Sequence, residues 1–221
     1  DNNFPEKYGT ASGNAQIDVT QSVFGGASCL FNGGSDAVNF GDSADWDFGT
    51  GDFGLRFRFQ LKPNTGGTYR AIFEIGKNDV SGVLIGMDNS SYLFVTINNT
   101  TYNTSWAPSL NTWYSLNVSR IGSILYVKID NVVKYSGAQS SDITGSTQGV
   151  SIGASTTYPT YKYDGWIDEV RIISGVGFTD SDASVAYINA AYYNTYRLDI
   201  KNLGSTTTSI LLHGTVSAFN N

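Results

Sequence analysis

Short stretches of alternating apolar and polar residues recur along this chain, separated by clusters of Gly, Asn, Asp and Ser. The clearest stretch is 55–61, LRFRFQL, in which every second residue is apolar. Because side chains alternate between the two faces of a strand, this period predicts strands with one buried face. Many short strands with regular turn signals predict an all-β sandwich or barrel. The other predicted strands are 92–97, 114–118, 125–129, 132–135, 150–152 and 166–173.

The same alternation predicts the core. We expect the two sheets to share a core that contains five residues from four different strands, namely Phe57, Phe59, Leu116, Val127 and Val170. Cys29, the only cysteine, lies in a strand-like stretch and is predicted to be a small buried hydrophobe, because it has no internal partner for a disulfide.

One segment departs from the strand period. Residues 180–182 offer a helix N-cap, and Val185, Ile188 and Tyr192 then share one face at helical spacing. This pattern predicts one short helix near the C-terminus. Since no Pro- or Gly-rich linker divides the chain, residues 1–221 are predicted to form a single domain.

Composition and charge narrow the function. Hydrophobic residues make up 40% of the chain, which excludes a disordered protein, and only 14% are charged. The net charge of −6 and the pI of about 4.6 argue against nucleic acid as a partner. No apolar run reaches the roughly 18 residues that a membrane-spanning helix needs. A polar but uncharged surface is typical of proteins outside the cell or on a virus particle, so we expect an extracellular or virion-surface location.

Four stretches together resemble the laminin-G-like branch of the concanavalin A-like jelly rolls. They are 30–38 (LFNGGSDAV), 42–53 (DSADWDFGTGDF), 113–132 and 165–172 (GWIDEVRI), and they occur in the family's order. The resemblance implies a two-sheet antiparallel jelly-roll sandwich. The second stretch looks like versions found in phage tail and surface proteins and in secreted bacterial proteins. The fold hosts lectins, glycosidases, adhesion modules and structural proteins, so it does not define the function.

The order of the strands departs from the family pattern. Relatives usually begin with a strand similar to LLLH, followed by a loop and GNAQ, whereas here GNAQ stands at 13–16 and the strand SILLHG stands at 209–214. The chain therefore looks circularly permuted or strand-swapped. Residues 179–221 are predicted to form the helix and a C-terminal strand, built on Ile210, Leu211 and Leu212, that completes either its own sheet or a neighbour's.

Little in the chain supports catalysis. Glycosidases of this superfamily carry two glutamates close together on one strand, but the three glutamates here, Glu6, Glu74 and Glu169, lie far apart in sequence. His213 is the only histidine and follows two leucines on a predicted strand, which favours a structural role. We therefore predict that the chain is not an enzyme.

Asp168 is a candidate metal ligand. Alternation from Trp166 places it on the same face as Val170, which predicts that its side chain turns inward. A buried carboxylate needs hydrogen bonds or a cation. The resemblance implies a structural calcium held by Asp168 with oxygen ligands from the loop that carries Gly34 and Asp36. The alternative is that Asp168 accepts backbone N–H groups at a strand corner.

An aromatic loop precedes the last predicted core strand. Tyr158, Tyr161, Tyr163 and Asp164 combine aromatic rings with polar groups, as in lectins that stack on sugar rings and as in protein interfaces. The sequence leaves both kinds of contact open. The leading hypothesis is a non-catalytic structural or attachment protein on a virion or an extracellular assembly, with self-association or other coat or surface proteins as partners. The alternative is a carbohydrate-binding lectin module for cell-surface glycan, and a glycoside hydrolase is a distant third.

Overall fold

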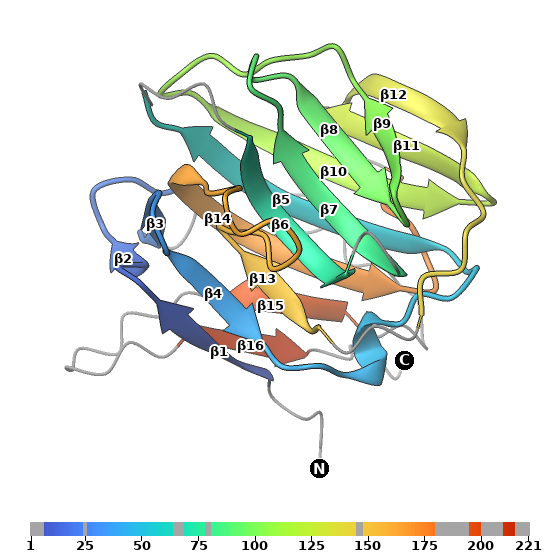
Figure 1. Ribbon diagram of the computed structural model, residues 1–221, viewed down its shortest axis with the longest axis horizontal. Coiled ribbons are helices and arrows are strands. Elements are labelled where there is room, and N and C mark those ends of the chain that lie inside the picture. The colour runs from blue at the N-terminus through green and yellow to red at the C-terminus, as the bar shows by residue number, and fades with distance from the viewer. Residues whose placement is uncertain are drawn as a thin grey trace, which may run out of the picture.

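The fold is a sandwich of two antiparallel sheets (Figure 1). The computed structural model describes residues 7–23, 26–63, 69–77, 81–144, 148–179, 195–199 and 210–214. Strand β1 (Lys7–Ser12) contributes to both sheets, because Lys7–Gly9 pair with β16 and Thr10–Ser12 pair with β4. A short 3₁₀ helix, η1 (Ala44–Trp46), follows β4. The two-sheet antiparallel jelly roll predicted from the sequence is confirmed.

Sheet A is the larger layer. Its strands follow the order β12-β11-β10-β5-β14-β15-β16-β1, and β3 and β2 attach to the free edge at the start of β14. The bounds are β2 (Gln16–Asp18), β3 (Ser28–Asn32), β5 (Phe53–Leu61), β10 (Trp113–Ile121), β11 (Ile124–Ile129), β12 (Val132–Ala138), β14 (Asp164–Ser174), β15 (Thr195–Asp199) and β16 (Ile210–Gly214).

Sheet B begins at β1 and follows the order β1-β4-β13-β6-β7-β8-β9. In Figure 1 its strands β7 and β8 lie in front of β5 and β10 of sheet A. The bounds are β4 (Ala37–Phe40), β6 (Arg70–Lys77), β7 (Ser81–Met87), β8 (Leu93–Ile97), β9 (Thr100–Asn103) and β13 (Val150–Ile152).

The core lies between the two sheets, as the alternation predicted. The Phe57 ring of sheet A stacks on the Phe73 ring of sheet B with their centroids 5.9 Å apart. Cys29 and the five predicted core residues are each at most 1% exposed, which confirms the predicted core. The five are Phe57, Phe59, Leu116, Val127 and Val170. Burial raises the pKa of the Cys29 thiol to about 12, so the thiol stays protonated and unreactive.

A β-bulge in β14 corrects the predicted orientation of Asp168. The register with β5 shifts between Asp168 and Arg171, and Glu169 adopts a left-handed φ of 53°. Ile167 and Val170 both belong to the core, so the extra residue at the bulge reverses the alternation. Asp168 therefore lies on the outer face of sheet A, opposite to Val170, and the segment at Val23 covers it.

The C-terminal strand lies in sheet A of its own chain. β16 pairs antiparallel with β1, where Lys7 faces Leu212, and with β15, where Leu198 faces Leu212. The helix predicted over 180–192 lies outside the described residues. Within the described ranges, no helix is long and apolar enough to cross a membrane.

Candidate functional site

The aromatic loop folds over the outer face of sheet B. Leu84 of β7 and Phe94 of β8 form a small apolar cluster with Ala71 of β6, separate from the main core. Tyr158 and Tyr161 pack against this cluster. The loop that links β13 to β14 therefore covers β6 to β8 on the side that faces away from the core.

Glu74 holds the loop in place. Its side chain is fully buried on β6, and its Oε2 accepts hydrogen bonds from the backbone N of Thr156 at 2.5 Å and of Thr157 at 3.3 Å. The hydroxyl groups of Thr156 and Thr157 also donate to this carboxylate, at 2.9 and 2.6 Å. Four donors compensate the burial of the carboxylate, and bonds to a charged acceptor are stronger than neutral ones. Glu74 therefore anchors the loop by its first residues.

Three tyrosines, Tyr69, Tyr158 and Tyr161, form what we call the tyrosine cluster. The Tyr161 ring stacks on the Tyr69 ring at a centroid distance of 4.8 Å and an interplanar angle of 11°. The Tyr158 ring lies 4.8 Å from the Tyr161 ring at 26°. Tyr69 also contacts the Phe94 ring edge to face, with centroids 6.0 Å apart. Two distant parts of the chain thus build one continuous aromatic surface.

The cluster is partly open to solvent and chemically amphipathic. Tyr69 is 39% exposed, and Tyr158 and Tyr161 are half-buried. Burial raises the pKa of Tyr161, and the neighbouring Tyr69 and Tyr158 raise it further, so its hydroxyl remains a neutral donor at physiological pH. Aromatic rings that end in hydroxyls offer an apolar contact surface with hydrogen-bonding groups at its margin.

Tyr163 does not belong to this surface, which corrects the prediction. Its ring is fully buried in the main core, where it lies edge to face with Phe31 at a centroid distance of 6.2 Å. Its hydroxyl donates to the Gln60 carbonyl at 2.7 Å, and burial raises its pKa well above the usual value. The backbone explains the difference, because the Tyr163 N–H bonds the Gly153 carbonyl and so returns the chain to the sandwich.

Asp164 lies with sheet A rather than with the tyrosine cluster. It is the first residue of β14, opposite Asn32, and its Oδ1 lies 3.8 Å from Lys62 Nζ. Burial raises the pKa of Asp164, while the positive charges of Lys62 and Arg70 oppose that shift. Of the four residues predicted as a binding loop, the structure therefore brings together Tyr158 and Tyr161.

The predicted calcium ligands do not converge. Asp36 accepts the backbone N–H groups of Asn14 at 2.8 Å and Asn32 at 2.7 Å. Asn32 faces Asp164, which lies four residues from Asp168 along β14, or roughly 13 Å at the rise of a strand. In the part of the chain that the structure describes, no three His, Cys, Asp or Glu side chains are grouped as a metal site. This separation does not fit the single calcium site predicted from Asp168, Asp36 and Gly34.

Asp168 instead shows the alternative arrangement. Its Oδ2 accepts the Val23 N–H at 2.9 Å, and its Oδ1 accepts the Glu169 N–H at 2.8 Å. These bonds compensate the buried carboxylate with backbone donors at the bulge. Calcium binding by this chain stays a prediction.

Sequence reasoning missed Tyr69, Phe94 and Glu74. The sequence could have indicated Glu74, since it is a lone carboxylate within the apolar run AIFEI (71–75) and a buried carboxylate needs hydrogen-bond partners. No sequence pattern indicates Tyr69, because its contact with Tyr161 depends on the pairing of β13 with β6.

Comparison with known proteins supports the fold. No family model matches the sequence, and no curated protein matches it. Among solved structures, domain 4 of AbnA, a GH43 extracellular arabinanase from Geobacillus stearothermophilus, was determined in complex with arabinotriose. It is 20% identical at a TM-score of 0.55, over 76% of this chain and 78% of that chain.

Two botulinum neurotoxin structures are also similar. The serotype G binding domain is 16% identical with a TM-score of 0.59, over 77% of this chain and 44% of that one. The binding domain of neurotoxin DC, in complex with rat synaptotagmin II, is 14% identical with a TM-score of 0.56, over 80% of this chain and 45% of that one. The chain thus spans less than half the length of the two toxin chains. At these identities the likeness shows the fold alone, which is an antiparallel jelly-roll sandwich.

Proposed function

We propose that this chain is a non-catalytic carbohydrate-binding module and that the tyrosine cluster is its binding surface. The observation that carries the proposal is the stack of Tyr69, Tyr161 and Tyr158, fixed by Glu74 on the outer face of sheet B. A surface anchored by a buried carboxylate is already ordered before a ligand arrives, which reduces the entropic cost of binding.

The chemistry of the cluster favours a sugar. A sugar ring presents C–H groups on its faces and hydroxyls around its rim, so aromatic rings and phenolic hydroxyls match it in both respects. The net charge of −6 disfavours an acidic glycan, so we expect a neutral oligosaccharide. The arabinotriose complex of the similar arabinanase domain supports the proposal, since a sandwich of this shape accommodates an oligosaccharide there.

The module's setting follows from its composition. A surface with few charges supports work on a virion or in an extracellular assembly, where glycan binding would attach the particle or protein to a cell. Mass spectrometry of purified particles and of culture supernatant tests this setting, and recovery of the chain only from the cell interior would contradict it.

A glycan array tests the function. We expect the wild-type protein to bind a limited set of neutral oligosaccharides, and Tyr69→Ala and Tyr158→Ala to weaken that binding at least about tenfold, or 1.4 kcal/mol. Tyr126→Ala is the matched control, because Tyr126 lies on β11 of sheet A. Equal binding by all four proteins would move the site elsewhere. Failure of the wild type to bind any glycan would refute the proposal.

A further inference from the structure

The turn between β7 and β8 lies at the end of sheet B that carries the tyrosine cluster. Tyr69 directly precedes β6, Asp88 directly follows β7 and Tyr92 directly precedes β8. The three strands are neighbours in sheet B and pair antiparallel (Figure 1). The three residues therefore stand side by side at one end of the sheet, and we call them the Asp88 row.

The Asp88 row belongs to the outer face of sheet B. The Tyr69 ring contacts the Phe94 ring, which is part of the apolar cluster on that face. Tyr92 stands two residues before Phe94, so the alternation of a strand places it on the same face. A Cβ on Gly86 would lie 2.9 Å from the Phe94 ring, so Gly86 also faces outward, and Asp88 stands two residues further along. The row therefore continues the surface of the tyrosine cluster.

Hydrogen bonds hold the Asp88 carboxylate in place by one of its two oxygens. Asp88 Oδ1 accepts the backbone N–H groups of Ser90 and Tyr92, both at 2.9 Å. The Ser91 N–H also bonds the Asp88 carbonyl at 2.9 Å, which closes the turn. Among the described residues, none donates a hydrogen bond to Asp88 Oδ2. A carboxylate has about four lone-pair sites, so Oδ2 keeps about two of them for a ligand.

The neighbours of Asp88 select a neutral ligand. Tyr69 is 39% exposed and Tyr92 is 45% exposed, so an aromatic ring is open to contact on each side of the carboxylate. A carboxylate between two tyrosines also suits an ammonium group. However, the buried Arg70 guanidinium donates to Ser91 Oγ at 3.0 Å, which places a positive charge at the same turn and disfavours a cation. The charge of Asp88 likewise disfavours an anion.

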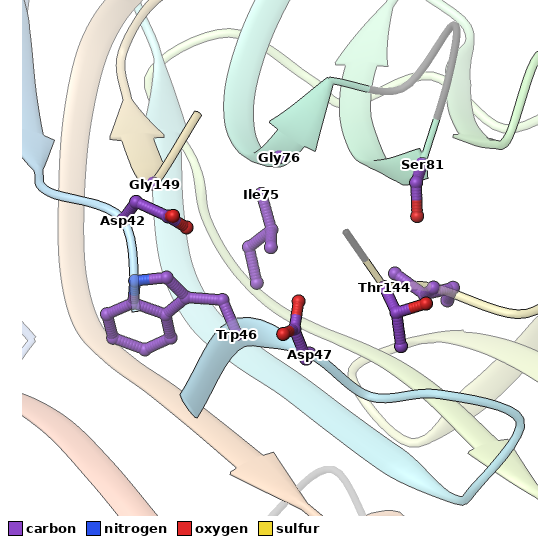
Figure 2. Close-up of a pocket in the computed structure, with 9 residues that line it drawn as sticks. Asp42, Trp46, Asp47, Ile75, Gly76, Ser81, Thr144 and Gly149 are labelled. Carbon is purple, nitrogen blue, oxygen red and sulfur yellow. The ribbon is translucent and has the colours of Figure 1, made fainter. Parts of the chain in front are cut away.

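The depression at the opposite end of β6 is too small for a sugar ring. It is lined by residues that include Trp46, Ile75 and Ser81 (Figure 2), and it has room for about one water molecule. The buried Ser81 hydroxyl, which has no hydrogen-bond partner among the described residues, needs no more than such a water. The depression therefore does not extend the binding surface, whereas the Asp88 row at the Tyr69 end does.

We propose that the Asp88 row binds one sugar residue of a neutral oligosaccharide through a pair of adjacent hydroxyls. Both hydroxyls donate to Asp88 Oδ2, and the rings of Tyr69 and Tyr92 contact the C–H groups beside them. Two strand spacings, roughly 9.6 Å, separate the two tyrosines, so one ligand can reach both of them and Asp88. The inference rests on the proposed function, and it makes Asp88 and Tyr92 the residues that determine which sugar the tyrosine cluster accepts.

Amide NMR titration tests the proposal. The probes are arabinotriose and the neutral oligosaccharide with the strongest signal on the glycan array, with choline as the cationic probe. Asp88→Asn keeps Oδ1 as the acceptor for Ser90 and Tyr92 but replaces Oδ2 by a donor, so the turn should stay intact and the Tm unchanged. We expect this variant to bind the oligosaccharide at least about tenfold more weakly, as the loss of hydrogen bonds to a charged acceptor implies. Tyr92→Ala should weaken binding roughly threefold or more.

Deoxy forms of the bound oligosaccharide identify the hydroxyl pair. In the wild type, removal of either of two adjacent hydroxyls should weaken binding about as much as Asp88→Asn does. In Asp88→Asn, the same removal should have little further effect, because the contact is already lost. The diol contact is wrong if no adjacent pair of hydroxyls shows this dependence on Asp88.

A matched control and Tyr69→Ala separate the outcomes. Asp130→Asn removes one negative charge in the β11–β12 turn and keeps an acceptor for the Ser115 N–H, so it should bind like the wild type. If Tyr69→Ala weakens binding while Asp88→Asn and Tyr92→Ala bind like the wild type, the inference is overturned and the proposed function stands. If the wild type binds no oligosaccharide, both are overturned. Binding of choline that Asp88→Asn abolishes would replace the sugar by a cationic ligand.

Discussion

The anchor of the tyrosine cluster makes the most specific stability prediction. Glu74→Ala removes a fully buried carboxylate that accepts four hydrogen bonds, two of them from the backbone N–H groups of Thr156 and Thr157. Each buried donor left without a partner costs about 1–3 kcal/mol. The threonine hydroxyls can rotate toward other acceptors, so the two backbone groups dominate. We expect a total cost of about 3–5 kcal/mol.

Glu74→Gln is the matched comparison. The amide oxygen can still accept both backbone N–H groups, and the threonine hydroxyl that faces the amide nitrogen can turn to accept. The bonds lose their charge assistance but keep their partners, so the cost should be below about 2 kcal/mol. A large difference between the two variants would show that the hydrogen bonds, rather than the negative charge, hold the loop.

Urea unfolding and amide hydrogen exchange together measure this effect. If the loop detaches only with global unfolding, Glu74→Ala lowers the free energy of unfolding by the full amount. If the loop opens on its own, the global value changes little and the amides of Thr156 and Thr157 exchange faster by a corresponding factor. A global loss below about 1 kcal/mol with unchanged exchange of both amides would refute the anchoring role of Glu74.

Four further predictions concern the core, the cysteine, calcium and the C-terminal strand. Phe59→Ala should lower the free energy of unfolding by about 3–5 kcal/mol in urea, and a loss below about 1 kcal/mol would be incompatible with its place in the core. Burial raises the pKa of the Cys29 thiol from 9.0 to about 12, so the thiol should not react with a thiol reagent at pH 8 unless the protein unfolds. The same shift predicts that the free energy of unfolding falls as the pH rises from 9 toward 12, because only the thiol of the unfolded chain ionises in that range. If calcium binds at Asp168, a chelator should lower the Tm of the wild type and have much less effect on Asp168→Asn, whereas an unchanged wild-type Tm would remove the metal. Deletion of 208–221 removes β16 from between β15 and β1 of its own sheet, so it should give an unstable monomer, and an unchanged free energy of unfolding would contradict this pairing.

The alternation of apolar residues predicted the strands, an all-β sandwich or barrel and its core, and the family resemblance implied the two-sheet jelly roll. Phe57 and Phe59 lie in a regular strand, where the period of two places every second side chain between the sheets. The same rule failed at Asp168, because Glu169 adds one residue at a bulge and reverses the faces beyond it. A bulge depends on pairing with β5, which the sequence of β14 alone does not specify.

The candidate site was only partly predictable for a related reason. Tyr161 and Tyr163 stand two residues apart in an aromatic loop, but a backbone bond from Tyr163 to Gly153 turns one ring into the core and leaves the other outside. The ring that stacks on Tyr161 belongs to Tyr69, which stands directly before β6, and its position depends on the order of strands in sheet B. Local patterns identify such rings, and the topology decides which of them meet.

The most direct test of the central claim is a side-chain NMR titration with the neutral oligosaccharide that binds best on the glycan array. We expect the ring protons of Tyr69 and Tyr158 to shift on binding, while those of Tyr126 on sheet A stay unchanged. Shifts confined to other parts of the molecule, with the rings of the tyrosine cluster unaffected, would contradict the claim that this cluster is the carbohydrate-binding surface.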